Sequence, residues 1–127
     1  MPTNYTDQFY TFDPANPPPP GTSVTFVLYT LRDQNDDGDV DRFNNDRVNG
    51  SDVVNSYPGD TVTINVGGVN VTYTGITFYL ANGQRVFTPT DGQVLQNGTF
   101  VSATFVTTQG PVAVPTELGP ACFTPGR

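Results

Sequence analysis

The amino-acid sequence predicts an all-β fold, a small antiparallel β-sandwich or partly closed barrel with a calcium-binding loop and an extended proline-rich N-terminal arm. Segments rich in β-branched and aromatic residues alternate polar with apolar side chains, as strands do when one face is buried. Gly-Gly and Asn-Gly pairs separate these segments and favour hairpin turns. Because no segment keeps an apolar period of about 3.6 residues, the pattern predicts no amphipathic helix.

We expect residues 1–21 to form an N-terminal arm and spacer outside the β domain. Residues 1–12 are polar with interspersed aromatic side chains, and such an arm can pack on the domain or on a neighbouring subunit. Pro14 and the run from Pro17 to Pro20 follow. A proline run of this kind forms a semi-rigid polyproline II spacer of ~3.1 Å per residue.

The β domain is predicted over residues 22–115. Its expected strands are residues 24–31, 61–66, 69–73, 75–80, 85–87, 93–96, 99–106 and 112–114. Gly67-Gly68, Asn82-Gly83 and Asn97-Gly98 predict two-residue hairpins between neighbouring segments, with type I′ turns at the Asn-Gly pairs. Aromatic strand residues suit either a hydrophobic core or a carbohydrate platform, and core packing is the favoured interpretation. These residues are Phe26, Tyr29, Tyr73, Phe78, Tyr79, Phe87, Phe100 and Phe105.

Oxygen-bearing side chains occupy alternate positions of a loop that begins at Asp33. Counted from that residue, the donors at positions 1, 3, 5, 7 and 9 are Asp33, Asn35, Asp37, Asp39 and Asp41. Gly38 stands at position 6, where a calcium loop turns sharply, and Val40 can anchor the loop to a core. Ca²⁺ takes about six to eight oxygen ligands at ~2.3–2.6 Å, so this spacing predicts a calcium site. The alternative is a solvated acidic turn, because Asp, Asn and Gly also dominate ordinary loops.

The loop departs from the EF-hand pattern in two ways. Position 12 is Asn44 instead of a bidentate Glu, and the flanking residues favour strands and turns over helices. We therefore expect a calcium loop of modest affinity over residues 33–46, with its last ligand from Asp46 or Asp52. The predicted ligand set is Asp33, Asn35, Asp37, Asp39, Asp41, Asn44 and Asp46. A calcium sensor needs flanking helices that open, so the expected role of calcium is structural support.

The ionisable residues exclude several classes of function. The net charge is −7, and eight of the twelve acidic residues lie between Asp33 and Asp60. Lysine and histidine are absent, so neither a nucleic acid nor an anionic membrane surface is an expected partner. The same inventory excludes Ser-His-Asp and Cys-His catalysis, Schiff-base chemistry and a P-loop, and it suits zinc poorly. Paired-carboxylate hydrolysis stays formally open, although carboxylates spaced to bind an ion are poor candidates for it.

The sequence predicts an extracellular or cell-surface location. An acidic, lysine-free chain with a calcium loop suits the millimolar Ca²⁺ found outside cells. No apolar run approaches the ~20 residues that span a bilayer, so membrane insertion is not expected. Residues 1–12 lack the basic start and apolar middle of a signal peptide, and we expect any export address to lie elsewhere or to be of another type.

The residues Cys122-Phe123-Thr124-Pro125-Gly126 resemble the opening of bacterial Hint (hedgehog/intein) domains. The remaining chain resembles the calcium-loop β module found ahead of such domains, and this likeness rests on residues 5–9, 33–41, 57–63 and 86–99. Together the two resemblances cover nearly the whole chain. They imply that Cys122 is a nucleophile that attacks the carbonyl of Ala121 in an N-to-S acyl shift, with help from a histidine deeper in the Hint domain. We expect that reaction only in a longer chain and predict no enzymatic activity here, because these residues include no histidine.

The leading hypothesis is a non-enzymatic, calcium-stabilised structural or adhesive surface module, the passenger ahead of a Hint self-processing domain. One alternative is a carbohydrate-binding module whose site combines aromatic residues with the acidic cluster. Another is a subunit of a surface or virion filament that self-associates through its N-terminal arm. The expected partners are a calcium ion and, in the alternatives, a glycan or a second copy of the chain.

Overall fold

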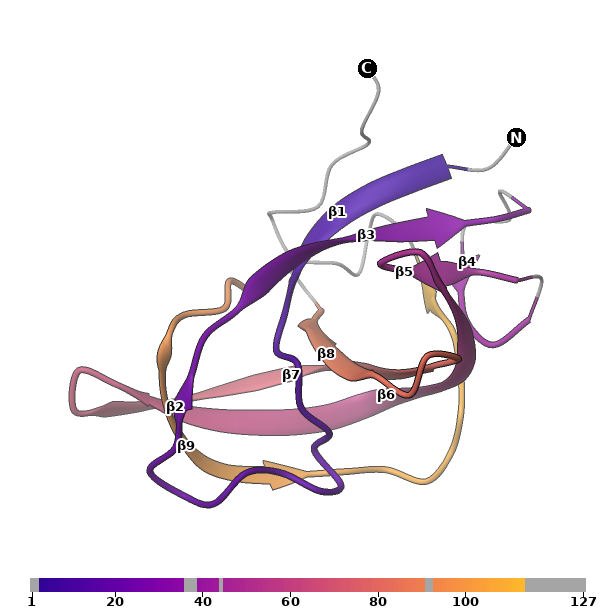
Figure 1. Cartoon of the computed structure of the whole chain (residues 1–127). Helices are drawn as coiled ribbons and strands as arrows, with labels where there is room; N and C mark the ends of the chain where they lie inside the picture. The colour runs from indigo at the N-terminus through magenta and orange to yellow at the C-terminus, as the bar shows by residue number, and fades with distance from the viewer. Residues whose placement is uncertain (1–2, 36–38, 44, 91–92, 114–127) are drawn as a thin grey trace.

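The computed structural model describes residues 3–35, 39–43, 45–90 and 93–113, and Figure 1 shows how their strands are arranged. Over these residues the fold is all-β and contains no helix, which confirms the predicted class. The strands are β1 (Thr3–Phe9), β2 (Ser23–Val24), β3 (Val27–Asp33), β4 (Asp39–Val40), β5 (Arg47–Val48), β6 (Ser51–Val66), β7 (Val69–Leu80), β8 (Arg85–Pro89), β9 (Gly98–Thr104) and β10 (Val112–Ala113).

An antiparallel sheet with the strand order β1-β3-β5-β6-β7-β8 forms the body of the domain. Strand β9 pairs with β6 and β2, and β10 pairs separately with β4. Just after β1, the backbones of Tyr10 and Phe87 exchange two hydrogen bonds of 2.9 Å and join the edge strands β1 and β8 at one point. The sheet is not closed, because this single bridge does not continue as a ladder.

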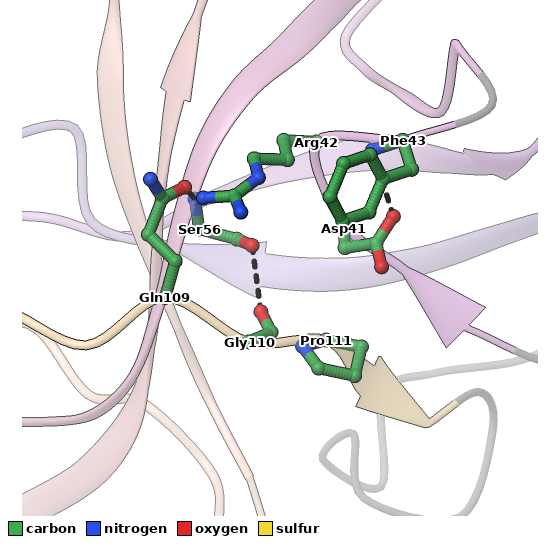
Figure 2. A pocket seen from close by; sticks show the side chains of 7 residues that line it. All are labelled: Asp41, Arg42, Phe43, Ser56, Gln109, Gly110 and Pro111. Atoms are coloured by element: carbon green, nitrogen blue, oxygen red, sulfur yellow. Dashed lines mark hydrogen bonds between the residues drawn. The ribbon is translucent and has the colours of Figure 1, made fainter.

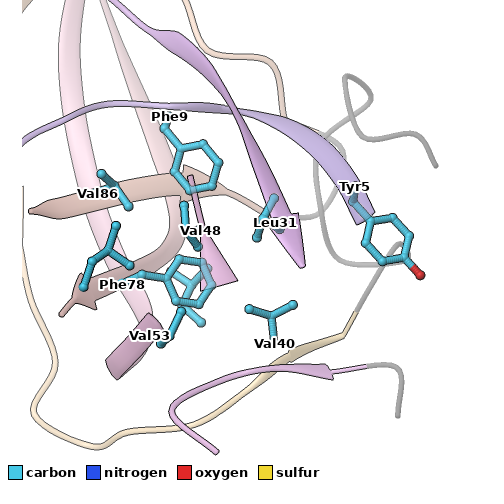
Figure 3. Close-up of a cluster of buried hydrophobic side chains, with 10 residues drawn as sticks. Tyr5, Phe9, Leu31, Val40, Val48, Val53, Phe78 and Val86 are labelled. Atoms are coloured by element: carbon cyan, nitrogen blue, oxygen red, sulfur yellow. The ribbon is translucent and has the colours of Figure 1, made fainter. Parts of the chain in front are cut away.

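Buried apolar side chains form two hydrophobic cores. The first, drawn in Figure 3, contains Tyr5, Phe9, Leu31, Val40, Val48, Val53, Ile76, Phe78, Leu80 and Val86. The second contains Tyr10, Val24, Val62, Ile64, Tyr73, Phe87, Leu95 and Phe100. Chain neighbours such as Val86 and Phe87 belong to different cores because successive side chains of a strand point to opposite faces. The first core anchors the loop, since Val40 belongs to it as predicted.

Residues 3–10 pack on the domain, which was one of the two alternatives for the predicted arm, and they do so as part of its sheet. Strand β1 pairs with β3 from Thr3 opposite Asp33 to Phe9 opposite Val27. Phe9 and Tyr10 are fully buried, one in each core. Burying two large aromatic side chains contributes several kcal/mol and, together with the β1–β3 hydrogen bonds, offsets the entropy cost of ordering this segment. The proline run that follows is mostly exposed, as a spacer would be.

Of the hairpin turns, the one predicted at Gly67-Gly68 forms as expected. At Asn82-Gly83 the turn type differs from the prediction, and a hairpin that was not predicted forms at Asn49-Gly50. Gly67 and Gly68, with φ of 59° and 92°, join β6 to β7 in the predicted hairpin. The β7–β8 hairpin also forms, but only Gly83 of the Asn82-Gly83 pair has a positive φ, so the predicted type I′ turn is wrong there. Asn49-Gly50, with φ of 51° and 78°, makes an unpredicted two-residue hairpin between β5 and β6.

The hairpin predicted at Asn97-Gly98 is wrong. Residues 93–97 are not a strand, and β9 pairs with β6 instead. Leu95 is buried in the second core, where its N–H donates to Gln8 Oε1 at 2.8 Å. The Asn97 side chain accepts a hydrogen bond from the Phe26 N–H at 3.0 Å. Core burial and side-chain bonds thus outweigh the local hairpin preference of an Asn-Gly pair.

The aromatic strand residues differ in their exposure to solvent. Tyr73, Phe78, Phe87 and Phe100 are buried in the cores, which confirms core packing for them. Tyr79 is half-buried, and Phe105 is exposed to 55%. Tyr79 and Phe105 are therefore among the aromatic side chains that a ligand can contact.

Candidate functional site

Two buried carboxylates stand at the base of the predicted calcium loop. Asp33 ends β3 on the same face as Leu31, because the two residues are separated by one position of a strand. That face points into the first core, so Asp33 is carried inward and is fully buried. Asp46 lies directly before β5 and is fully buried as well. Burial of a carboxylate is costly unless donors or a cation compensate its charge.

The Asp46 carboxylate ties the two ends of the loop together. Its Oδ1 accepts a hydrogen bond from the Gln34 N–H at 2.9 Å, and its Oδ2 accepts one from the Asp41 N–H at 3.0 Å. One side chain thereby spans the point where the loop leaves β3 and the point where it follows β4. Each carboxylate oxygen has two lone pairs, so each of them keeps acceptor capacity for a further ligand.

Electrostatic repulsion concentrates at the same place. Burial, with a smaller contribution from the nearby charges of Asp33 and Asp41, raises the pKa of Asp46 to about 6, against the lowering effect of the two backbone donors. Three carboxylates therefore act on one another where the loop closes. A group of oxygen donors with excess negative charge suits a hard divalent cation and suits zinc or copper poorly.

The other predicted ligands are placed differently. The Asp41 carboxylate is half-buried, and its Oδ1 accepts the Phe43 N–H at 2.9 Å in a local turn. Asn35 is exposed. Asp39 belongs to β4 by its backbone, whereas its side chain, Asp37 and Asn44 lie outside what the structure describes. Among the described residues, no three carboxylates converge closely enough to hold a metal ion by themselves.

Asp46 and Asp52 were alternative sources of a final ligand, and the structure places them apart. Asp46 contacts the loop, as described above. Asp52 lies on β6 at the surface, where its Oδ1 accepts a hydrogen bond from Arg47 Nε at 3.0 Å and both side chains are nearly half exposed. Asp52 is therefore a natural control for experiments on the loop.

A pocket of about 180 Å³ adjoins the loop (Figure 2). Asp41, Arg42 and Phe43 line one side of it, and the Arg42 guanidinium lies 4.7 Å from the centre of the Phe43 ring. On the other side, Ser56 Oγ donates to the Gly110 carbonyl at 2.6 Å, and the Gly110 N–H donates back to the Ser56 carbonyl at 3.1 Å. These bonds hold the C-terminal part of the described chain against β6.

Beyond Gly110 the chain continues into β10, which pairs with β4, the short strand within the loop. Val112 lies opposite Val40, and Ala113 opposite Asp39. Sequence reasoning predicted a short strand over 112–114 but not its partner. The two segments are more than 70 positions apart, and no local pattern indicates such a pairing. Ordering of the loop therefore stabilises β10 as well, because β4 and β10 are paired through their backbones.

The remaining predictions concern residues or properties outside this site. The predicted tail over residues 116–127, which carries Cys122 and the start of the Hint-like segment, lies outside the described residues. Within the described ranges, no helix has the length and apolar character needed to cross a membrane. Searches against protein-family models, curated proteins and solved structures found no match to this chain. The resemblance to Hint-associated modules accordingly stays a prediction.

Proposed function

We propose that this chain is a non-enzymatic, calcium-stabilised structural or adhesive module of a surface protein, the passenger ahead of a Hint domain. One observation carries the calcium part of the proposal. Two fully buried carboxylates, Asp33 and Asp46, stand at the closure of a loop whose sequence supplies further oxygen donors at alternate positions. Without a cation, such an arrangement combines a desolvation cost with like-charge repulsion.

The residues fit a calcium ion chemically. Asp33 and Asp46 would supply carboxylate oxygens from the buried side, and the loop would supply the oxygens of Asp37, Asp39 and Asp41. Asp46 keeps one lone pair on each oxygen while it binds the Gln34 and Asp41 N–H groups. The ion supplies positive charge that compensates the carboxylates, and binding would lower the free energy of the closed loop.

The proposed role is mechanical support rather than signalling. The described residues contain no helices for a bound ion to open. They instead place the loop between β3 and β5, with Val40 in the first core and β4, within the loop, paired to β10. A rigid loop at this position would stabilise the edge of the sheet and the segment that leads toward the tail.

Thermal unfolding in calcium and in a chelator tests the proposal. Binding raises the free energy of unfolding by about 2.7 kcal/mol when the ligand is at 100 times its Kd, so millimolar Ca²⁺ should raise the melting temperature by several degrees. Asp33→Asn should abolish most of that rise, and the matched surface variant Asp52→Asn should keep it. An unchanged melting temperature in 10 mM Ca²⁺, taken as roughly a saturating concentration for a weak site, would overturn the proposal.

A further inference from the structure

A second pocket, of about 150 Å³, lies away from the calcium loop and has aromatic walls. Tyr57, Tyr79 and Phe105 line it together with one carboxylate, Asp60. The Tyr57 and Tyr79 rings meet edge to face with their centres 5.2 Å apart. Phe105 is exposed to 55%, so its ring is open to contact with a ligand.

A β-bulge in β6 turns Asp60 inward. The pairing of β6 with β7 shifts by one residue between Pro58, which lies opposite Ile76, and Asp60, which lies opposite Gly75. Gly59 between them has a φ of 106°, a conformation that L-residues with a side chain rarely adopt. Bulges of this kind change the direction of a neighbouring side chain. As a result only 2% of the Asp60 surface is exposed, although the residue lines the pocket.

Among the described residues, only neutral hydrogen-bond donors contact the Asp60 carboxylate. Thr77 Oγ1 donates to Oδ2 at 2.7 Å, and the Val106 N–H donates to Oδ1 at 2.7 Å. No arginine of the described chain forms an ion pair with it. Burial raises the pKa of Asp60, and the charge of nearby Asp13 adds to this effect. A cation at the carboxylate would therefore be favoured.

The neighbouring carboxylate shows how this part of the domain holds a cation. Asp13 Oδ2 accepts hydrogen bonds from Arg85 Nη1 at 3.2 Å and from the Tyr79 hydroxyl at 2.7 Å. The Arg85 guanidinium carbon also lies 4.0 Å from the centre of the Tyr79 ring. A carboxylate and an aromatic face thus bind one cation together. Asp60, with Tyr57 and Phe105 beside it, offers the same two elements and has no such partner within the described residues.

We infer that this pocket binds an alkylammonium group supplied by another molecule. The positive nitrogen would face the Asp60 carboxylate, and its carbon substituents would pack on Tyr57, Tyr79 and Phe105, an arrangement in which aromatic rings bind quaternary and primary ammonium ions. The 127 residues contain no lysine, so no lysine of this sequence can occupy the pocket. The net charge of −7 also favours the approach of a cation over that of an anion.

A titration followed by NMR tests the inference. The probes are choline and n-butylammonium, and the readout is the set of ring signals of Tyr57, Tyr79 and Phe105. We expect saturable shifts in the millimolar range for both ammonium probes. The neutral isostere 3,3-dimethyl-1-butanol should bind about tenfold more weakly, because it keeps the shape and loses the charge. Equal binding of the isostere, or of glucose, would overturn the inference and indicate an apolar or carbohydrate site.

Two variants locate the interaction. Asp60→Asn keeps an acceptor for the Val106 N–H, and its amide can donate to the Thr77 hydroxyl, which then reverses its role. It should weaken choline binding about tenfold, whereas the surface control Asp52→Asn should not. Phe105→Ala removes an exposed wall of the pocket and should weaken binding severalfold. Wild-type affinity in both pocket variants, with melting curves showing that they fold, would contradict the inference.

The ammonium site and the proposed calcium site are separable. No residue of loop 33–46 lines the ammonium pocket, and the titration should give the same result in calcium and in a chelator. Failure of the calcium experiment would leave the ammonium inference standing, and the reverse also holds.

Discussion

Two regions of this domain bury carboxylates, and they compensate the charge in different ways. At the base of the loop, Asp46 receives two backbone N–H groups while Asp33 and Asp41 repel it. At the second region, Asp13 is paired with an arginine and a tyrosine hydroxyl, and Asp60 is held by a threonine and one N–H. The first arrangement brings several negative groups together. The second arrangement keeps its carboxylates apart: Asp13 lies beside Arg85, and Asp60 lies beside aromatic rings.

The difference indicates which cation each region suits. Backbone donors hold the geometry of the loop base but do not neutralise its carboxylates, and the proposed complement there is a small divalent ion. The Asp60 pocket offers one negative group and apolar walls, which suit a larger monovalent ion with carbon substituents. Charge density and the polarity of the walls, more than the number of acidic residues, separate the two regions.

Removal of the Asp46 side chain should have the largest effect. Asp46→Ala leaves the Gln34 and Asp41 N–H groups without their acceptor, and hydrogen bonds to a charged group are worth about 1.5–3 kcal/mol each. We expect the free energy of unfolding in calcium to fall by about 3 kcal/mol, as measured by urea denaturation. In a chelator the loss should be smaller, because a repelling charge disappears as well. Asp52→Ala, the surface control, should change the value by no more than about 0.5 kcal/mol. A loss as small as the control's would contradict the role of Asp46 in closing the loop.

Calcium should also slow amide exchange in the C-terminal segment. Because β10 pairs with β4, an ordered loop should protect the backbone amides of the Val40–Val112 pair about tenfold more strongly than a calcium-free loop. The Val106 N–H, which donates to Asp60, serves as the internal control and should not change. Hydrogen exchange followed by NMR in calcium and in a chelator measures both. Equal protection of β10 under the two conditions, with a calcium-dependent rise in melting temperature, would show that loop and segment are independent.

A smaller effect is expected from the titration of Asp60. Because its pKa is raised above the usual value of 3.8 by burial and by Asp13, the folded protein holds this proton to a higher pH than the unfolded chain does. Wild-type stability relative to Asp60→Asn should therefore rise as the pH falls from 7 toward 4. Below the ordinary pKa both states are protonated and the change should end. Melting curves at several pH values, in a chelator, test this, and a pH-independent difference would show that the charge of Asp60 costs the fold nothing.

Parts of the fold and of the site followed from short stretches of sequence. The β6–β7 hairpin was predictable because two glycines supply the positive φ angles that a tight turn requires. The Asn49-Gly50 turn carried the same kind of signal and could have been found from it. The oxygen donors of the loop were readable from their alternate spacing. Each of these features depends on residues that are close in the chain.

Predictions were incomplete or wrong where a distant partner decides the outcome. Residues 3–10 were expected to form an arm that packs on the domain or on a neighbouring subunit, and only the structure shows that Tyr10 and Phe9 complete two cores whose other members lie far along the chain. Asn97-Gly98 does not form a hairpin, because Leu95 is drawn into a core and Asn97 binds Phe26. No window of sequence contains both partners of these contacts.

By itself, the sequence determined the all-β class, the positions of several turns and the oxygen-rich character of the loop, because backbone preference and side-chain chemistry are local properties. Tertiary structure alone decided that Asp46, and not Asp52, closes the loop and that β10 pairs beside it. It also decided that Asp60 is buried among aromatic rings. Burial and electrostatic repulsion depend on which distant segments the sheet brings together, and strand pairing sets that arrangement.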